Sequence, residues 1–311
     1  MYGHAESYVE LTKPGGLWER LVYEKSNGRL LIDNKPRLFP TKEILPAVGQ
    51  GKVDVGFFPS AFMAGTYPLF NYGAIPGLFD TIYEEWAVTS DPRVRELFNK
   101  AYREIGAVWL CDLASVANEG IWAAERKIDT VEKFKGLKAR TSGFIQTKTL
   151  EVLGASPVTI SITELEQALY RGTVDAITTG LTYGWLHGLT DLCKYVNVWP
   201  MVTPGFTFPW VMNAEAFDSL PADLQKAIVD ATEEATYLQY YGMICDRLYG
   251  LQGIAMTGCE IVNPSEAEIA KGKELTKPVR DEWLKIAGPY GAELLKYVDE
   301  DVANYRAFAG K

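Results

Sequence analysis

The sequence predicts an α/β protein of two domains, in which one long helix spans both domains. The chain has 311 residues, more than one ordinary hydrophobic core accommodates. Residues 43–58 and 164–179 align without a gap, and both indicate a helix followed by a strand. Residues 220–252 then read as one uninterrupted amphipathic helix. These three observations define the predicted architecture.

The repeated unit has the pattern E-x-x-x-A-[V/L]-x-x-G-x-V-D-[V/A], as in EILPAVGQGKVDVGFF and ELEQALYRGTVDAITT. Gly51 and Gly172 should adopt the left-handed conformation that ends a helix before a strand. An apolar strand is expected before each unit, over residues 28–36 and 154–162. Each half therefore alternates helices and strands, which predicts parallel sheets.

The long stretch 220–252 would form a helix roughly 45 Å long at 1.5 Å per residue. This is longer than one small domain needs, so we expect the helix to cross both halves. A strand over 208–217 precedes it and should cross back between the halves. Residues 264–298 predict terminal amphipathic helices, interrupted at Pro278 and at Gly288.

These elements suggest domain boundaries with a ligand cleft between the domains. Ligands of open α/β sheets bind beyond the carboxyl ends of the strands. By the repeat, Phe57-Phe58 and Thr178-Thr179 take equivalent places at the edges of that cleft. The expected division is domain I, residues 1–120 and 214–250, and domain II, residues 121–213 and 251–311.

The composition excludes several classes of protein. The net charge is −9 and the pI about 5.0, so the surface should repel nucleic acid. The sequence contains no run of 18 or more apolar residues, so no membrane span is predicted. No signal peptide is recognisable, which taken literally means a cytoplasmic protein. The same start is expected of the mature form of an exported protein, with Met1 where a leader was removed.

The cysteines and histidines give little support for catalysis or metal binding. The four cysteines form no CxxC motif; Cys245 and Cys259 could form a disulfide in an oxidising compartment, or remain buried thiols. His4 and His187 are the only histidines, and no Ser-His-Asp set, P-loop or H-E-x-x-H motif occurs. An enzymatic function therefore rests on the fold class alone.

Arg140 is the candidate binding residue in GLKARTSG, residues 136–143. It ends an apolar strand, and the nearest upstream acid, Glu132, is eight residues away. A guanidinium presents its donors in a rigid fork that suits a carboxylate. Arg140 could hold the carboxylate of a ligand, or it could form a salt bridge between the domains.

Several stretches together resemble the solute-binding proteins of TRAP transporters, the DctP family. The family pattern G-L-K-x-R, a Gly-Ala-x-Pro-Val strand and E-x-x-x-A-L-x-x-G-x-V-D is matched by residues 136–176. Residues 26–57 resemble the N-terminal unit of the family, and residues 211–228 resemble the entry into its long helix. The similarity covers roughly residues 8–250.

The resemblance implies a hinged, periplasmic-binding-protein-like fold whose two α/β domains close around an organic acid. The arginine of G-L-K-x-R, here Arg140, would be the carboxylate anchor. The protein would work in the periplasm and deliver its ligand to the membrane subunits of a TRAP transporter. Neither a cofactor nor a bound nucleic acid is expected.

This sequence departs from two branches of the family at positions that concern the ligand. The sialic-acid branch has a second arginine where this chain has Gly120, and the keto-acid branch has a glutamine at the position of Glu119. The keto-acid branch also binds a cation through residues that correspond to Thr178, Thr179 and Phe208. No metal is therefore expected. A carboxylate at Glu119 would suit an ammonium, an indole N–H or a hydroxyl.

Aromatic residues stand near the predicted cleft, which suggests a ligand carboxylate with a flat indole or phenyl body. Core packing is the alternative for each of them. We expect Arg140, Glu119, Thr178 and Thr179 to bind the ligand. The aromatic candidates are Phe58, Phe206, Phe208, Trp18 and Trp122, beside Phe57 and Trp210.

Two other functions remain open on the sequence. A two-domain enzyme could use Arg140 to anchor an organic acid and Glu119 as general base. A ligand-sensing domain in signalling would share the same cleft.

Overall fold

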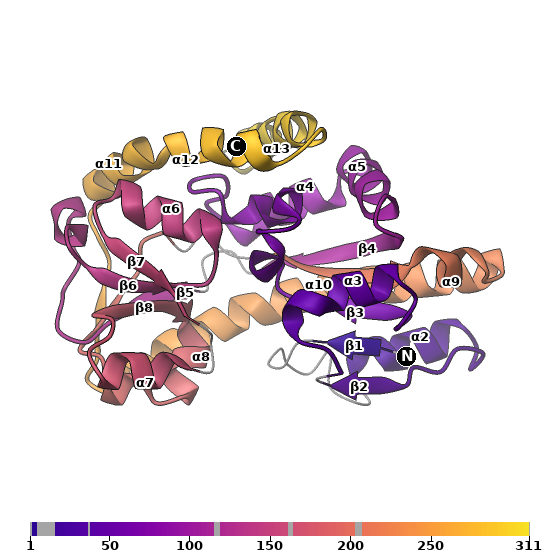
Figure 1. Ribbon diagram of the computed structural model, residues 1–311, viewed down its shortest axis with the longest axis horizontal. Coiled ribbons are helices and arrows are strands. Elements are labelled where there is room, and N and C mark those ends of the chain that lie inside the picture. The colour runs from indigo at the N-terminus through magenta and orange to yellow at the C-terminus, as the bar shows by residue number, and fades with distance from the viewer. Residues whose placement is uncertain are drawn as a thin grey trace.

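The computed structural model of the chain describes residues 2–4, 16–36, 38–114, 119–160, 164–202 and 207–310. It contains two β-sheets, one in each half of the molecule, as Figure 1 shows. We call the first sheet with its helices the first lobe, and the second sheet with its helices the second lobe. This two-part α/β architecture confirms the predicted fold class.

The first lobe is built on a five-stranded sheet with the order β2-β1-β3-β10-β4. β1 runs parallel to β2 and β3, and β10 runs antiparallel to β3 and β4. Its strands are β1 (Tyr2–His4), β2 (Asn34–Pro36), β3 (Val55–Phe57), β4 (Ala107–Ala114) and β10 (Thr207–Asn213). Its helices are α2 (Leu17–Lys25), η1 (Thr41–Glu43), α3 (Ile44–Gly49), η2 (Ser60–Met63), η3 (Pro68–Ala74), α4 (Ile82–Ser90), α5 (Pro92–Arg103) and α9 (Ala214–Asp218).

The second lobe is built on a six-stranded sheet with the order β11-β9-β5-β8-β6-β7. β6 runs parallel to β7 and β8, whereas β5 runs antiparallel to β8 and β9. Its strands are β5 (Glu119–Ala123), β6 (Lys138–Thr141), β7 (Ser156–Thr159), β8 (Ala176–Gly180), β9 (Tyr195–Asn197) and β11 (Glu260–Val262). Its helices are η4 (Val131–Phe134), α6 (Phe144–Val152), α7 (Leu165–Tyr170), α8 (Leu181–Leu186) and η6 (Leu189–Asp191).

The predicted repeat is present as α3 followed by β3 and as α7 followed by β8. Gly51 and Gly172 both have φ of 67°, which confirms the left-handed turn between each helix and strand. The strand expected over residues 28–36 is shorter than predicted. Only β2 pairs with β1. Leu31 before it is 80% exposed, whereas Leu30 and Ile32 on either side are half-buried against a hydrophobic cluster of the first lobe.

The long helix α10 (Ala222–Ala255) has 34 residues and crosses both lobes, as predicted. In the first lobe, the Thr236 hydroxyl donates to Cys111 Sγ of β4 over 3.0 Å. In the second lobe, the Thr182 hydroxyl of α8 donates to the carbonyl oxygen of Asp246 over 2.8 Å. Gly250 allows this approach, because a Cβ there would lie 2.6 Å from Thr182 Oγ1. No described helix is both long and apolar enough to cross a membrane.

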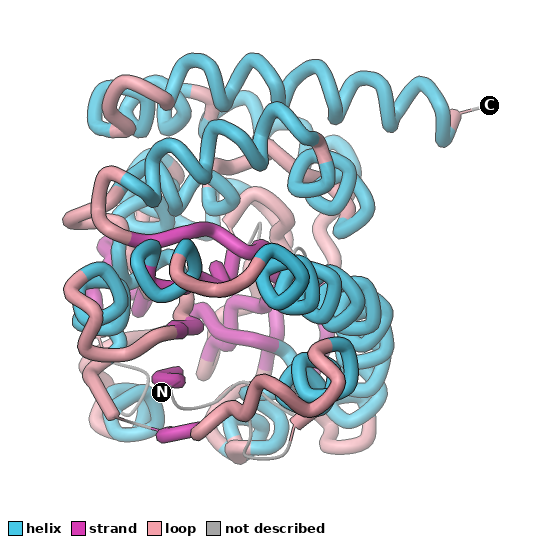
Figure 2. The backbone as a smooth tube through the Cα atoms, turned by 90° about the vertical axis from the view of Figure 1, so that its right-hand side faces the viewer, coloured by secondary structure: helices cyan, strands magenta, loops and turns pink. Residues whose placement is uncertain are grey.

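Three C-terminal helices form a layer above the strands, which Figure 2 shows from the side. They break at the predicted places, since α12 begins at Pro278 and Gly288 has φ of 77°. The layer is tied to the first lobe where Arg306 Nε donates to Glu84 Oε1 of α4 over 2.8 Å. The helices are α11 (Glu266–Thr276), α12 (Pro278–Ile286) and α13 (Gly291–Ala309).

The observed sheets and the expected domain boundaries differ in two places. β10 and α13 were both expected in domain II, yet β10 pairs within the first sheet and α13 contacts α4. The reason is that β10 inserts between β3 and β4, a pairing with strands about 100 and 150 residues earlier that local sequence patterns do not reveal.

The four cysteines are free thiols, so Cys245 and Cys259 form no disulfide, and of these two only Cys259 is the buried thiol of the second alternative. Cys245 is exposed on α10, whereas Cys111, Cys193 and Cys259 are buried. Burial raises the pKa of Cys111 and of Cys193 to about 12. These thiols therefore stay protonated and act as small apolar groups.

Candidate functional site

Arg140 lies near the carboxyl end of β6, where the sequence predicted a binding residue. Its side chain is only 3% exposed. Nε donates to the carbonyl oxygen of Ile160 and Nη1 to that of Thr178, both over 2.8 Å. Because carbonyl oxygens carry no net charge, these bonds orient the guanidinium and leave its positive charge intact.

Thr178 and Gln146 extend this arrangement into a buried network. The Thr178 hydroxyl, on β8, donates to Gln146 Oε1 over 2.8 Å, and the Ser142 backbone N–H donates to the same oxygen over 2.9 Å. Gln146 stands in the first turn of α6, directly after the strand that carries Arg140. It thereby connects β8 with the turn between β6 and α6.

Glu119 opens β5 and lies on the other side of Gln146. Its carboxylate is 8% exposed, and Gln146 Nε2 donates to Oε2 over 3.4 Å. Burial raises the pKa of Glu119 to about 7, and the nearby Arg140 and Gln146 only partly oppose this rise. Near neutral pH the side chain can therefore accept a proton or a hydrogen bond from a ligand.

The turn after Arg140 touches the first lobe. A Cβ on Gly143, the residue before α6, would lie 2.9 Å from the carbonyl oxygen of Ala61 in η2. The neighbouring Ser60 hydroxyl is 2.8 Å from the hydroxyl of Thr207, the first residue of β10. Arg140 thus stands three residues before Gly143, at the contact between the lobes.

The predicted aromatic residues pack within hydrophobic clusters. Phe58 and Trp122 are fully buried, and a Cβ on Gly184 would lie 2.4 Å from the Trp122 ring. Phe208 stacks on Phe57 at 5.8 Å and is 4% exposed. Each of these rings has protein neighbours that account for its burial.

Trp18 packs in the same manner, against Trp210 at 4.9 Å, and its Nε1 donates to Thr232 Oγ1 over 2.9 Å. Thr179, the remaining predicted residue of β8, is 5% exposed. Phe206 lies outside the described residues. Gln146 and Ser142 were not predicted; the available signal was a serine directly after G-L-K-A-R-T and a glutamine four residues further on.

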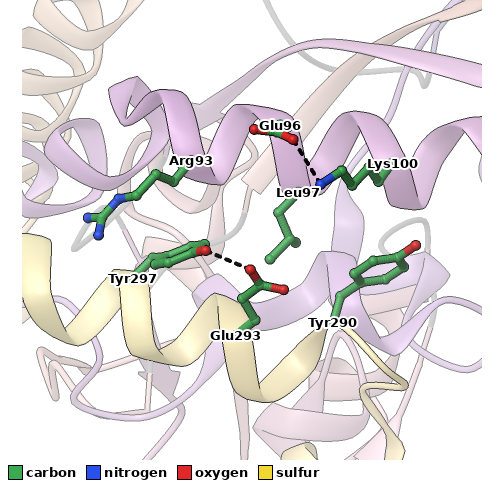
Figure 3. A pocket seen from close by; sticks show the side chains of 7 residues that line it. All are labelled: Arg93, Glu96, Leu97, Lys100, Tyr290, Glu293 and Tyr297. Carbon is green, nitrogen blue, oxygen red and sulfur yellow. Dashed lines mark hydrogen bonds and ion pairs between the residues drawn. The ribbon is translucent and has the colours of Figure 1, made fainter.

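Two hollows on the surface are not lined by Arg140. Figure 3 shows one of about 70 Å³ between α5 and α13. Lys100 pairs with Glu96 there at 2.8 Å, and Tyr297 donates to Glu293 over 2.6 Å, so its polar groups satisfy one another. A volume of that size suits a few waters at most. A larger hollow of about 400 Å³ is lined by residues of α12 and α13.

Metal binding finds no support in the described parts of the chain. Among these residues, no three His, Cys, Asp or Glu side chains come together as ligands of one ion. The functional groups around Arg140 are instead one cation, one carboxylate of raised pKa and several neutral hydrogen-bonding groups. This set suits the binding of a small polar molecule.

Comparison with known proteins places the chain in a family. The model of bacterial extracellular solute-binding protein family 7, DctP, matches residues 5–286. The chain is 26% identical over 291 residues to the 2,3-diketo-L-gulonate-binding periplasmic protein YiaO of Escherichia coli. This alignment covers 90% of this chain and 84% of that protein. It is 26% identical over 295 residues to the C4-dicarboxylate-binding periplasmic protein DctP of Rhodobacter capsulatus, at 92% and 85% coverage.

Solved structures share the fold. A TRAP periplasmic solute-binding protein from Desulfovibrio salexigens with bound orotic acid superposes with a TM-score of 0.85 at 22% identity, over 97% of this chain and 98% of that one. An extracytoplasmic solute receptor of Bordetella pertussis that binds pyroglutamic acid gives a TM-score of 0.84 at 21% identity, over 96% and 98%. The chain therefore belongs to family 7 of the bacterial extracellular solute-binding proteins, the DctP family, and is a solute receptor and not an enzyme.

Proposed function

We propose that this protein captures an organic acid in the periplasm and delivers it to the membrane subunits of a TRAP transporter. The observation that carries the proposal is Arg140, a guanidinium 3% exposed and fixed by two carbonyl oxygens beside the contact between the lobes. Such a preoriented fork favours a carboxylate bound through two hydrogen bonds. The ligands named for similar proteins, such as orotic acid, pyroglutamic acid and malonate, all carry a carboxylate.

We further propose that the ligand has a flat ring and a hydrogen-bond donor near the acid. Glu119 would accept from an amine or ring N–H, and Thr178 and Thr179 would form the floor beside Arg140. Orotic acid, bound to a protein of the same fold, has a carboxylate on a flat ring that carries N–H groups, which supports this ligand class.

Mass spectrometry of the small molecules released on denaturing the purified protein tests both statements. An aromatic acid released from the wild type and absent from Arg140→Ala is the expected result. An aliphatic acid would retain the anchor and refute the ring. Arg126→Ala is the matched control, because Arg126 also donates to carbonyl oxygens, of Lys133 and Lys135, but on the surface. Equal release from all three proteins would refute the anchor.

A further inference from the structure

Three polar side chains of the first lobe are buried in an unusual state, and two of them, Asp112 and Tyr72, interact electrostatically. Asp112 on β4 is 4% exposed, Asn71 in η3 is 1% exposed and Tyr72 beside it is fully buried. Within the described residues, Asp112 Oδ1, Asn71 Oδ1 and the Tyr72 hydroxyl have no hydrogen-bond partner. Buried polar groups nearly always have partners, so such a group marks a functional position.

Further ionisable groups surround Tyr72, and two of them, Tyr102 and Tyr240, also interact with Asp112. Glu85 reaches in from α4, Tyr102 from α5 and Tyr240 from α10, and each interacts electrostatically with Tyr72. Burial together with Asp112 and Glu85 holds the pKa of the Tyr72 hydroxyl well above 10, so it remains protonated. The cluster therefore combines two acids with hydroxyl groups.

No described cation neutralises Asp112. Burial raises its pKa to about 7; the nearby Trp109 indole opposes this slightly, although Nε1 makes no hydrogen bond of normal geometry. Arg95 is the basic residue that faces Cys111 next to it. Its guanidinium pairs with Glu233 at 3.0 Å and lies 5.4 Å above the Trp109 ring. An isolated buried carboxylate is costly unless something compensates it.

The cluster lies on the first-lobe side of the contact that Arg140 approaches. The Thr207 hydroxyl donates to the carbonyl oxygen of Phe70, the residue before Asn71, over 3.1 Å. The same hydroxyl meets Ser60, and the next residue, Ala61, faces Gly143 of the second lobe. A short chain of contacts thus connects the Arg140 turn with Asn71 and Tyr72.

We propose that Asp112, Asn71 and Tyr72 form a second recognition point, which binds a cationic ammonium group at the end of the ligand remote from its carboxylate. An ammonium offers three donors, and the cluster offers three acceptor oxygens. The ligand would span the lobes, with its acid on Arg140 and its ammonium on Asp112. This inference rests on the proposed function, because it assumes the carboxylate anchor.

Matched probes test the inference by isothermal titration calorimetry near pH 8, above the pKa of about 7 of Asp112. One set is 4-(aminomethyl)benzoate, 4-(hydroxymethyl)benzoate and 4-ethylbenzoate; the other is 5-aminopentanoate, 5-hydroxypentanoate and hexanoate. In at least one set, the ammonium member should bind roughly 10-fold or more tightly than the methyl member. Asp112→Asn should abolish this preference, whereas the surface control Asp230→Asn should keep it.

The unliganded variants give an independent readout. Asp112→Asn should raise the melting temperature, because it removes an uncompensated buried charge, and Tyr72→Phe should leave it unchanged or raise it. Lower melting temperatures in both variants would mean that the cluster is structural and would overturn the inference.

The failure of this inference and that of the anchor can be told apart. Equal binding of all members in the wild type, or no binding of any, would refute the ammonium site. Arg140→Ala tests the anchor separately, since it should weaken every member of a set alike. If the hydroxyl member binds most tightly, the ammonium site is refuted, whereas the role of Arg140 as carboxylate anchor is retained.

Discussion

Arg140 and Thr178 hold each other through reciprocal hydrogen bonds. Arg140 Nη1 donates to the Thr178 carbonyl oxygen over 2.8 Å, and the Thr178 hydroxyl donates to the Arg140 carbonyl oxygen over 3.0 Å. The two residues stand on the neighbouring parallel strands β6 and β8. The guanidinium is therefore oriented before any ligand arrives, which reduces the entropy lost on binding.

Arg140→Lys should lower the affinity for a carboxylate ligand by roughly 10-fold or more, about 1.4 kcal/mol. Lysine keeps the charge but not the planar fork, so the loss measures the contribution of bidentate geometry. Calorimetry with the ligand released from the wild type provides the measurement. Arg126→Lys, on the surface, should bind as the wild type does; wild-type affinity in Arg140→Lys would contradict the prediction.

Thr178→Val should destabilise the protein by about 1–2 kcal/mol and also weaken ligand binding several-fold. The change preserves shape but removes the hydroxyl whose single proton is shared between the Arg140 carbonyl oxygen and Gln146 Oε1. Urea unfolding and calorimetry measure the two effects.

Thr149→Val is the matched control for this network, because the Thr149 hydroxyl donates only to the helical carbonyl oxygen of Ile145, over 2.9 Å. It should lose stability without losing affinity. If both variants weaken binding equally, the Thr178 hydroxyl has no special part in orienting Arg140.

Glu119→Gln should remove a pH dependence of stability between about pH 4.5 and 7. The pKa of Glu119 rises from 4.5 to about 7 in the folded protein because the carboxylate is buried. The folded state thus binds the proton more tightly than the unfolded chain, so stability is lost as pH rises through this window. Above pH 7 this loss in the free energy of unfolding is complete and amounts to about 3 kcal/mol.

Urea unfolding at about pH 4 and about pH 8 measures this difference. Asp112, whose pKa is also about 7, titrates in an overlapping range, so the experiment compares Glu119→Gln with Asp112→Asn and with the double variant. If Glu119→Gln keeps the pH dependence of the wild-type unfolding free energy, ionisation of the Glu119 carboxylate does not destabilise the folded protein.

Features set by local sequence could be predicted. Gly51 and Gly172 end their helices with the same φ of 67°, because only glycine adopts that conformation without strain. Pro278 begins α12, and the unbroken stretch after Pro221 forms α10. Each of these depends on a residue and its immediate neighbours.

Features that depend on distant residues could not be predicted from the sequence. The Trp18 indole donates to Thr232, 214 residues later, and no local pattern distinguishes such a core tryptophan from one that lines a ligand. The place of β10 within the first sheet has the same origin. For the site, G-L-K-A-R indicated Arg140, whereas the role of Gln146 emerges only where Thr178, 32 residues away, meets it.

Gly143→Ala should weaken ligand binding roughly 3- to 10-fold, about 1 kcal/mol. Its backbone is extended (φ −172°, ψ −178°), so alanine meets no conformational strain there. Its Cβ would instead lie 2.9 Å from the Ala61 carbonyl oxygen, and the lobes would have to move apart. A ligand held between Arg140 and the first lobe then loses contacts. Calorimetry gives the affinity, and small-angle X-ray scattering gives the radius of gyration, which should increase.

Gly65→Ala is the control, since a Cβ at Gly65 has no atom within 4 Å. Affinity and radius of gyration should both match the wild type in that variant. If Gly143→Ala also has the affinity and radius of gyration of the wild type, the backbone at Ala61 accommodates the added Cβ, and closure of the lobes does not depend on this contact. A fall in affinity without an increase in radius would place the effect on the Arg140 turn itself, because Gly143 is also the residue from which α6 begins.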